Sequence, residues 1–205
     1  MKKVTGKRVI AYILDYLVVA MIASLFARVQ ILNPQYDDYM KDYQEYTEAV
    51  KQSAKGEIST EDLTELSYNV AKRSVNISII TIVVSLVYFV GFQYLNKGQT
   101  LGKKILKIKM VDTSEDKLKI YQVLLNSAVI NNLITSTISI LFILYLKKGV
   151  YFKYSEVLSL VETGLLLGSL AFMIMRNDGK GLHDLIAHTN VVAETKQHDV
   201  VAEEK

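Results

Sequence analysis

The stretch Val9–Ala27 reads VIAYILDYLVVAMIASLFA, 19 residues in which Asp15 is the single charge. A helix needs about 20 apolar residues to cross the hydrocarbon core of a bilayer, so this stretch is long enough. Three further stretches share its character: 75–95 and 122–146 carry no charge, and 154–175 carries two acids. Four such stretches in 205 residues leave too little polar surface for a soluble globule, so we expect membrane spans at about 9–32, 75–95, 122–146 and 154–175.

Composition excludes several other classes of protein. The chain has no Cys, which removes disulfide frameworks, thiolate catalysis, iron–sulfur clusters and cysteine zinc sites. Its net charge of +3 is too small to imply nucleic acid, and we expect neither a nucleic-acid partner nor a cofactor or metal. A cleavable signal peptide is the alternative reading of the N-terminus, but Asp15 inside a long apolar run argues against it.

The distribution of Lys and Arg predicts the orientation. The N-terminal tail, the second connection (96–121) and the C-terminal tail together carry 15 basic residues, and the two remaining connections carry 8. By the positive-inside rule, both termini therefore lie in the cytoplasm. Residues 193–205 have no apolar pattern, and we expect a flexible cytoplasmic tail there.

The first connection, 33–74, is acidic, with nine acids and five basic residues. Asn33-Pro34 ends the first span, because proline lacks a backbone donor and restrains the residue before it. Tyrosines then recur at steps of three and four along one helical face, and Ser59 three residues before Asp62 offers a cap for a second helix. We expect an extracytoplasmic helical insertion, a hairpin whose tyrosines form either its core or a ligand cradle.

The second connection alternates strictly at Leu106–Met110 and again at Leu118–Ile120, with turn residues between. This pattern predicts a short cytoplasmic β-hairpin or a pair of extended segments. Its lysines would face anionic lipid, each contributing about 1 kcal/mol of attraction. The overall fold class expected is thus an all-α membrane protein of four spans, with an outer helical hairpin and a β-hairpin-like connection.

Ionisable groups inside a span cost about 2.5–3.5 kcal/mol, so Asp15 and Glu162 need a partner, a proton or a watery cavity. Arg8 lies two helical turns before Asp15 on the same stripe, with a rise of about 10.5 Å. The third span carries a polar stripe that includes Asn131, Thr135 and Ser139 at steps of four. The stripe either faces Asp15 and Glu162 across the bundle or lines a water-filled path.

Three motifs occur in an order that resembles the RDD family of membrane proteins: KRVIAYILDYLVV (7–19), GQTLGKKILKIKMVD (98–112) and GKGLHDLIAHTNVV (179–192). The resemblance matches the family's Arg and two Asp to Arg8, Asp15 and Asp184. It departs from the family pattern at His188, where a small Gly usually precedes the Thr. The resemblance implies a bacterial cytoplasmic membrane protein and suggests transport.

Two motif segments fall on the expected cytoplasmic side: one contains Thr100, Gly102 and Lys103, and the other contains His183 and Asp184. Asp184 can accept bonds from Lys103 or Arg8. We expect an Arg8–Asp184 contact that ties the first span to the C-terminal segment, with Asp15 buried above it.

Three hypotheses about function remain open. A transporter of small cations, coupled to protons, would use Asp15 and Glu162 with the polar stripe as its path. Monovalent cations or protons would be its substrates, and with only four spans it would act as a homo-oligomer. A non-catalytic accessory or assembly module would instead meet an envelope partner through the acidic hairpin. An enzyme is the third reading, and we do not expect one, because no HExxH, P-loop, Rossmann or nucleophile-elbow motif is present.

Overall fold

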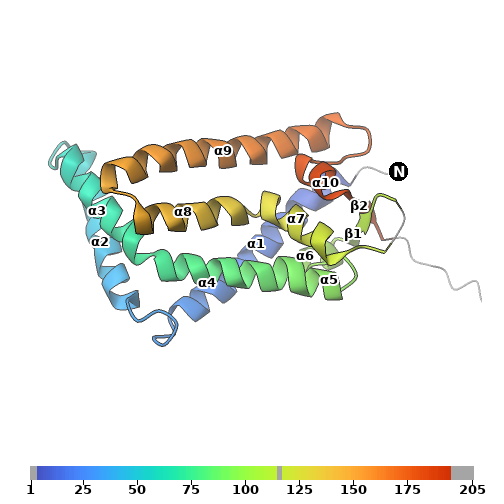
Figure 1. Ribbon diagram of the computed structural model, residues 1–205, viewed down its shortest axis with the longest axis horizontal. Coiled ribbons are helices and arrows are strands. Elements are labelled where there is room, and N and C mark those ends of the chain that lie inside the picture. The colour runs from blue at the N-terminus through green and yellow to red at the C-terminus, as the bar shows by residue number, and fades with distance from the viewer. Residues whose placement is uncertain (1–3, 115–116, 195–205) are drawn as a thin grey trace, which may run out of the picture.

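The computed structural model describes residues 4–114 and 117–194, and its helices run mostly along one long axis (Figure 1). The helices are α1 (Thr5–Ala27), α2 (Tyr36–Ser53), α3 (Thr60–Arg73), α4 (Val75–Leu86), η1 (Val87–Phe92), α5 (Gln93–Leu95), α6 (Leu101–Ile105), α7 (Ile120–Ile130), α8 (Leu133–Tyr145), α9 (Lys148–Met175) and α10 (Leu182–Ala187). The strands are β1 (Ile108–Asp112) and β2 (Thr189–Ala193). The fold is thus helical, with one small sheet.

Three continuous helical stretches are long and apolar enough to cross a membrane: Thr5–Ala27, Val75–Leu95 and Lys148–Met175. The α7–α8 pair passes the same test together but is bent by 60° at its break, so it makes a fourth span if counted as one. Helix α1 shows why these helices suit a bilayer. Its buried residues recur at steps of three and four, while large apolar residues such as Leu17 (60% exposed) and Leu25 (61%) point outward.

The third predicted span differs from the expectation of one continuous helix. It breaks at Asn131–Asn132, where Asn132 adopts the left-handed conformation with φ of 53°. Asn tolerates this conformation better than most residues, so the Asn pair is a suitable place for the break. The hydroxyl of Tyr12 on α1 donates to the Ile130 carbonyl at 3.3 Å, which satisfies one of the acceptors left at the end of α7.

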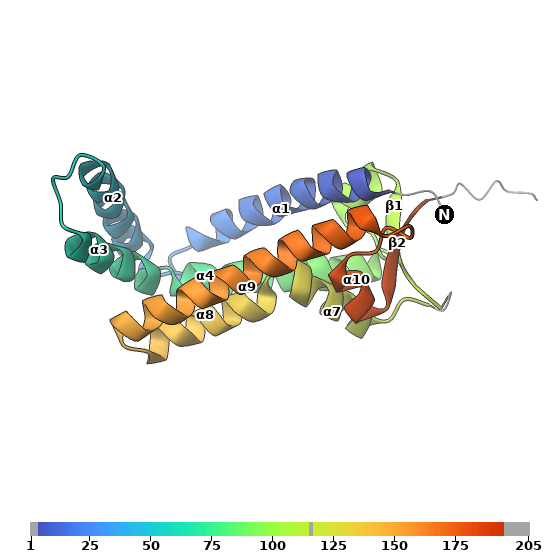
Figure 2. The same ribbon diagram turned by 90° about the horizontal axis from the view of Figure 1, so that it is seen from above.

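The insertion is a helical hairpin, α2 and α3, that stands beyond the bundle at one end, here called the hairpin end (Figure 2). Ser59 caps α3 as predicted, accepting the Asp62 amide at 3.0 Å. Arg73 joins the two helices through Asp38 (3.3 Å) and Asp42 (3.4 Å). Lys148, at the start of α9, pairs with Glu65 of α3. One of the three lysines of the third connection, Lys148, thus contacts the hairpin.

The tyrosine face predicted for the insertion is only partly covered. Tyr39 stacks on Tyr43 with ring centroids 5.9 Å apart, and Tyr43 remains 45% exposed. Tyr68 of α3 packs edge-on against Tyr151 of α9 at 5.7 Å. Aromatic contacts of this kind stabilise the hairpin and its junction with α9.

The opposite end, here called the sheet end, holds β1, β2, α6, α10 and the start of α1 (Figure 1). The sequence predicted the first strand but the wrong partner: β1 pairs antiparallel with β2, with Met110 opposite Val191. Lys119 is extended but is the N-cap residue of α7 rather than part of a ladder. The β-branched run Thr189–Ala193, directly after α10, supplies the partner strand instead.

The predicted tail begins at 193, which is the last residue of β2, and residues 195–205 lie outside the described part of the chain. His188, where the family pattern favours Gly, has φ of 53°. Its side chain is exposed, and its carbonyl accepts the amide of Thr113 at 3.2 Å. The departure from the family pattern therefore falls at a turn whose backbone suits glycine.

Candidate functional site

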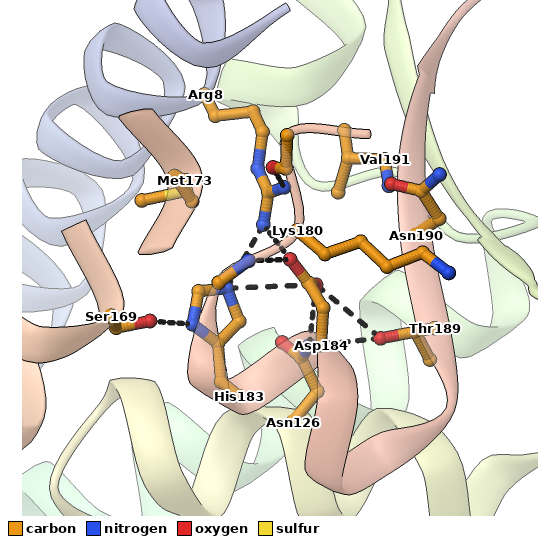
Figure 3. A network of polar contacts seen from close by, with 12 residues as sticks. Arg8, Asn126, Ser169, Met173, Lys180, His183, Asp184, Thr189, Asn190 and Val191 are labelled. Carbon is orange, nitrogen blue, oxygen red and sulfur yellow. Dashed lines mark hydrogen bonds and ion pairs between the residues drawn. The ribbon is translucent and has the colours of Figure 1, made fainter. Parts of the chain in front are cut away.

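A buried ion pair joins α1 to α10 at the sheet end (Figure 3). Arg8 of α1 is 8% exposed and Asp184 of α10 is fully buried, and their side chains meet at 2.5 Å. The guanidinium also donates to the Gly179 carbonyl at 2.7 Å. The contact expected from the sequence is therefore present, and it ties the first span to the segment that follows the last.

The Asp184 carboxylate is surrounded by donors. It accepts the Gly181 amide at 2.9 Å, which starts α10, and the Asn126 amide group at 3.1 Å. Asn126 also donates to Thr189 of β2 at 3.0 Å. Burial raises the pKa of Asp184, but the Arg8 guanidinium and the Gly181 amide outweigh this effect and hold the pKa below its usual value. Asp184 therefore stays ionised at neutral pH.

The tautomer of His183 follows from its partners. Nε2 lies 2.9 Å from Nη2 of Arg8, and a guanidinium can only donate, so Nε2 must accept. Nδ1 then carries the proton and donates to the hydroxyl of Ser169 on α9 at 2.5 Å. Burial lowers the pKa of His183 to about 4, consistent with a neutral ring. The Ser169 hydroxyl thus faces a donor rather than a base, which argues against a serine nucleophile.

Asp15 is 1% exposed and belongs to a second, separate cluster. Its carboxylate accepts three hydrogen bonds: from the Tyr88 hydroxyl (2.6 Å), the Thr100 hydroxyl (2.5 Å) and the Gly102 amide (2.7 Å). All three donors are neutral. The first Asp of the family motif therefore binds the turn that starts α6 and the π-helical segment η1 to α1.

Gly102 is required by this arrangement. A Cβ at this position would lie 2.4 Å from the Ala11 carbonyl oxygen and 3.0 Å from the carboxylate carbon of Asp15. Thr100 caps the same turn by accepting the Lys103 amide at 3.3 Å. In the motif TLGK, Thr100 is therefore the helix cap and Gly102 allows the close approach to α1, and Lys103 follows directly after them.

Lys103 lies between the two clusters without joining either. Its Nζ donates to the side-chain oxygen of Gln93 at 2.9 Å, and burial lowers its pKa to about 8. It lines a cavity of about 290 Å³, here called the sheet-end cavity, together with Arg8, Asp15 and His183. Asp184 pairs with Arg8 and not with Lys103 among the described contacts.

Two further cavities continue from the sheet-end cavity into the bundle. The middle cavity, about 380 Å³, shares Tyr12, Phe89 and Asn131 with it. The Glu162 cavity, about 270 Å³, shares Ile77, Thr81 and Ser136 with the middle one. The three cavities therefore form a series from the sheet end toward the hairpin end.

The predicted polar stripe is divided among these cavities. Asn131 lines the first two, and its Oδ1 is buried without a hydrogen-bond partner among the described residues. Ser139 lines the Glu162 cavity, whereas Thr135 bonds the Asn132 carbonyl at 3.0 Å. Glu162 faces hydroxyl groups and not Asp15, so the two acids expected to work together are apart.

Several residues of the site were not predicted. Tyr88 lies in an uncharged span, and Ser169 and Gln93 lie in apolar helices, so only their tertiary contacts mark them. Thr189 lies in the last of the three motifs, whose pattern does not reveal the strand that contains it. A polar residue in an apolar helix is the signal that was available for all but Thr189.

The apolar helices and the buried polar clusters define a multi-pass membrane protein. The family model described as RDD family matches residues 4–188, and the chain belongs to the RDD family. No curated protein and no solved structure shows significant similarity to it. The Arg8–Asp184 pair and the Asp15 cluster both lie within the matched residues.

Proposed function

We propose that this protein is a membrane transporter that exchanges a small cation for protons, with its sheet end in the bacterial cytoplasm. The observation that carries the proposal is the series of three cavities, in which each neighbouring pair shares lining residues; Arg8 lines the first cavity and Glu162 the last. Ionisable side chains such as Glu162 that line a cavity at membrane depth commonly mark substrate or ion pathways. The excess of Lys and Arg at the sheet end supports the orientation.

Glu162 is the carboxylate best suited to the exchange. It lies about 12 Å into the predicted fourth span, and no hydrogen bond or ion pair involves it among the described residues. Its cavity offers the hydroxyls of Ser78, Thr81 and Ser139. An unpaired acid costs about 2.5–3.5 kcal/mol at this depth, and binding a proton or a cation offsets that cost. Oxygen groups are the ligands that hard cations prefer.

The break between α7 and α8 supports the same proposal. Broken helices near the middle of the membrane are a common feature of transporter binding sites, because they release backbone groups to a cavity. Here the break places Asn131, with its unpartnered Oδ1, where the sheet-end and middle cavities meet. Movement of α8 against α7 would open one cavity at a time, and a homo-oligomer would support such a small bundle.

Flux through purified protein tests the proposal. The full chain is reconstituted into vesicles that contain a pH-sensitive dye, and Na⁺, K⁺ or Li⁺ is added outside. We expect a cation-driven pH change that Glu162→Gln abolishes. Glu156→Gln, an exposed acid on the same helix, is the matched control and should transport as the native chain does. No pH change above empty vesicles with any of the cations would contradict the proposal.

A second candidate is a non-catalytic accessory module, and the Asp15 cluster favours it. Three neutral donors satisfy Asp15, which is what a structural acid requires. The acidic hairpin beyond the bundle would then meet an envelope partner. On this hypothesis Asp15→Asn lowers stability or recovery of a partner, and neither it nor the native chain produces a flux above that of empty vesicles. The donor role of His183 toward Ser169 also supports a protein without enzymatic activity.

A further inference from the structure

Helix α6 has two unlike faces. On the inner face, Gly102 lies against α1 and donates its amide to Asp15. On the outer face, Leu101 is 42% exposed and Ile105 is 66% exposed. Residues four apart share a helix face, and the exposed Lys104 lies between these two. The outer face is therefore apolar, basic and uncovered by the described residues.

The position of α6 on α1 places it at the edge of the bilayer. Its inner face meets α1 at Ala11 and Asp15, which are about 3 and 9 Å into the first predicted span. A bilayer whose hydrocarbon core begins at the start of that predicted span would place Leu101 and Ile105 against acyl chains just below the headgroups. Lys104 can lay its methylene stem along the same apolar surface and extend its ammonium group to the headgroups.

Two more lysines flank α6 in an unusual backbone conformation. Lys97, four residues before α6, and Lys107, two residues after it, both have φ of 54°. Chains that end a helix with a left-handed residue usually place Gly or Asn there, because a longer side chain strains the backbone. Both lysines are exposed, and neither forms an ion pair with the described residues. Backbone geometry thus gives no reason for a lysine at either position.

We propose that the outer face of α6 binds the anionic headgroups of bilayer phospholipids, through Lys97, Lys104 and Lys107 with Leu101 and Ile105 as the apolar contact. Charge complementarity selects this partner: three unpaired cations and an apolar strip match a phosphate group above acyl chains. The opposite face of α6 is held by Asp15, and Lys103 between them lines the sheet-end cavity. Lipid occupancy therefore acts on the helix that borders this cavity.

The test compares lipid preference with folding. In vesicles of phosphatidylcholine, electron spin resonance measures how strongly spin-labelled phosphatidylglycerol associates with the full chain relative to spin-labelled phosphatidylcholine. Each lysine contributes about fivefold, so the triple variant Lys97→Asn, Lys104→Gln, Lys107→Asn should lose about 100-fold of this preference. Asn suits both left-handed positions, so the variant should unfold at the same or a higher temperature in neutral detergent.

A matched control removes the same charge at the hairpin end. Lys41, Lys55 and Lys72 are exposed lysines of the helical hairpin without ion pairs among the described residues, and their triple change to Gln should leave the preference intact. The charge-conserving variant Lys97→Arg, Lys104→Arg, Lys107→Arg should retain the preference for phosphatidylglycerol. The proposal is overturned if the Asn/Gln variant keeps its preference, if the hairpin variant loses as much, or if millimolar inorganic phosphate displaces the labelled lipid completely.

Discussion

Gly102 and Asp15 are the two residues on which the α1–α6 contact depends most. The Asp15 carboxylate accepts the Gly102 amide at 2.7 Å, and this approach leaves no room for a side chain on position 102. A single residue thus couples a buried charge on the first span to the turn that carries Lys103. At the same scale, the neutral His183 ring orients Arg8 toward Asp184.

Gly102→Ala should destabilise the protein by about 3 kcal/mol, because its Cβ would overlap the backbone oxygen of Ala11, which cannot move aside as a side chain can. Thermal unfolding of the purified chain in detergent measures the effect. Gly164→Ala is the control, since a Cβ there meets nothing within 4 Å. Equal melting temperatures for the two variants would contradict the Asp15–Gly102 contact.

His183 predicts a pH dependence of stability. Its pKa is about 4 in the folded state and about 6.5 when unfolded, so the unfolded chain binds the proton first as the pH falls. The stabilisation is complete above pH 6.5 and decreases by up to about 1.4 kcal/mol per pH unit toward pH 4.

His183→Gln keeps an acceptor for Arg8 but cannot be protonated. The difference in stability between the native chain and this variant should therefore decrease between pH 6.5 and pH 4. Asp184 titrates below this window because its pKa is lowered. If the difference in unfolding free energy between the two proteins did not change with pH, the claim that folding keeps His183 neutral would be contradicted.

Among the elements, those defined by local pattern were predictable and those defined by distant partners were not. Apolar length predicted the three continuous spans, and the Ser59 cap followed from a four-residue signature. The partner of β1 could not be chosen from alternation alone, because two extended segments were available and the closer one in sequence became the start of α7. The break at Asn132 depends on a left-handed residue that apolar periodicity does not reveal.

The strand pairing can be tested directly, since the native chain has no Cys and an engineered pair reports one contact. Lys109 lies opposite Val192 in the sheet, so Lys109→Cys with Val192→Cys should cross-link under mild oxidation. Lys109→Cys with Lys119→Cys represents the hairpin expected from the sequence and should stay reduced. Mass spectrometry of the digested protein distinguishes the outcomes, and the reverse result would contradict the observed register.

At the scale of the whole molecule, the Arg8–Asp184 pair and the cavity series are parts of one arrangement of the helices, since Arg8 belongs to both. The pair closes the sheet end by joining the first span to the segment after the last, while the cavities extend from it to Glu162. The sequence indicated the pair through the family resemblance, and it indicated polar groups inside the third span. The sequence could not show that Asp15 and Glu162 lie in separate cavities, because the distance between them depends on how the helices pack.

The accessibility of single cysteines in vesicles tests the polar route most directly. Asn131→Cys and Ser139→Cys place a thiol in the cavities, while Ile134→Cys and Leu141→Cys place it on the exposed apolar surface of α8. A charged, water-soluble thiol reagent should modify the first two and leave the last two unmodified, because a cation route requires water in the cavities whereas lipid would cover the exposed apolar surface. If Cys at 131 and 139 were as unreactive as Cys at 134 and 141, the route through the bundle would be contradicted.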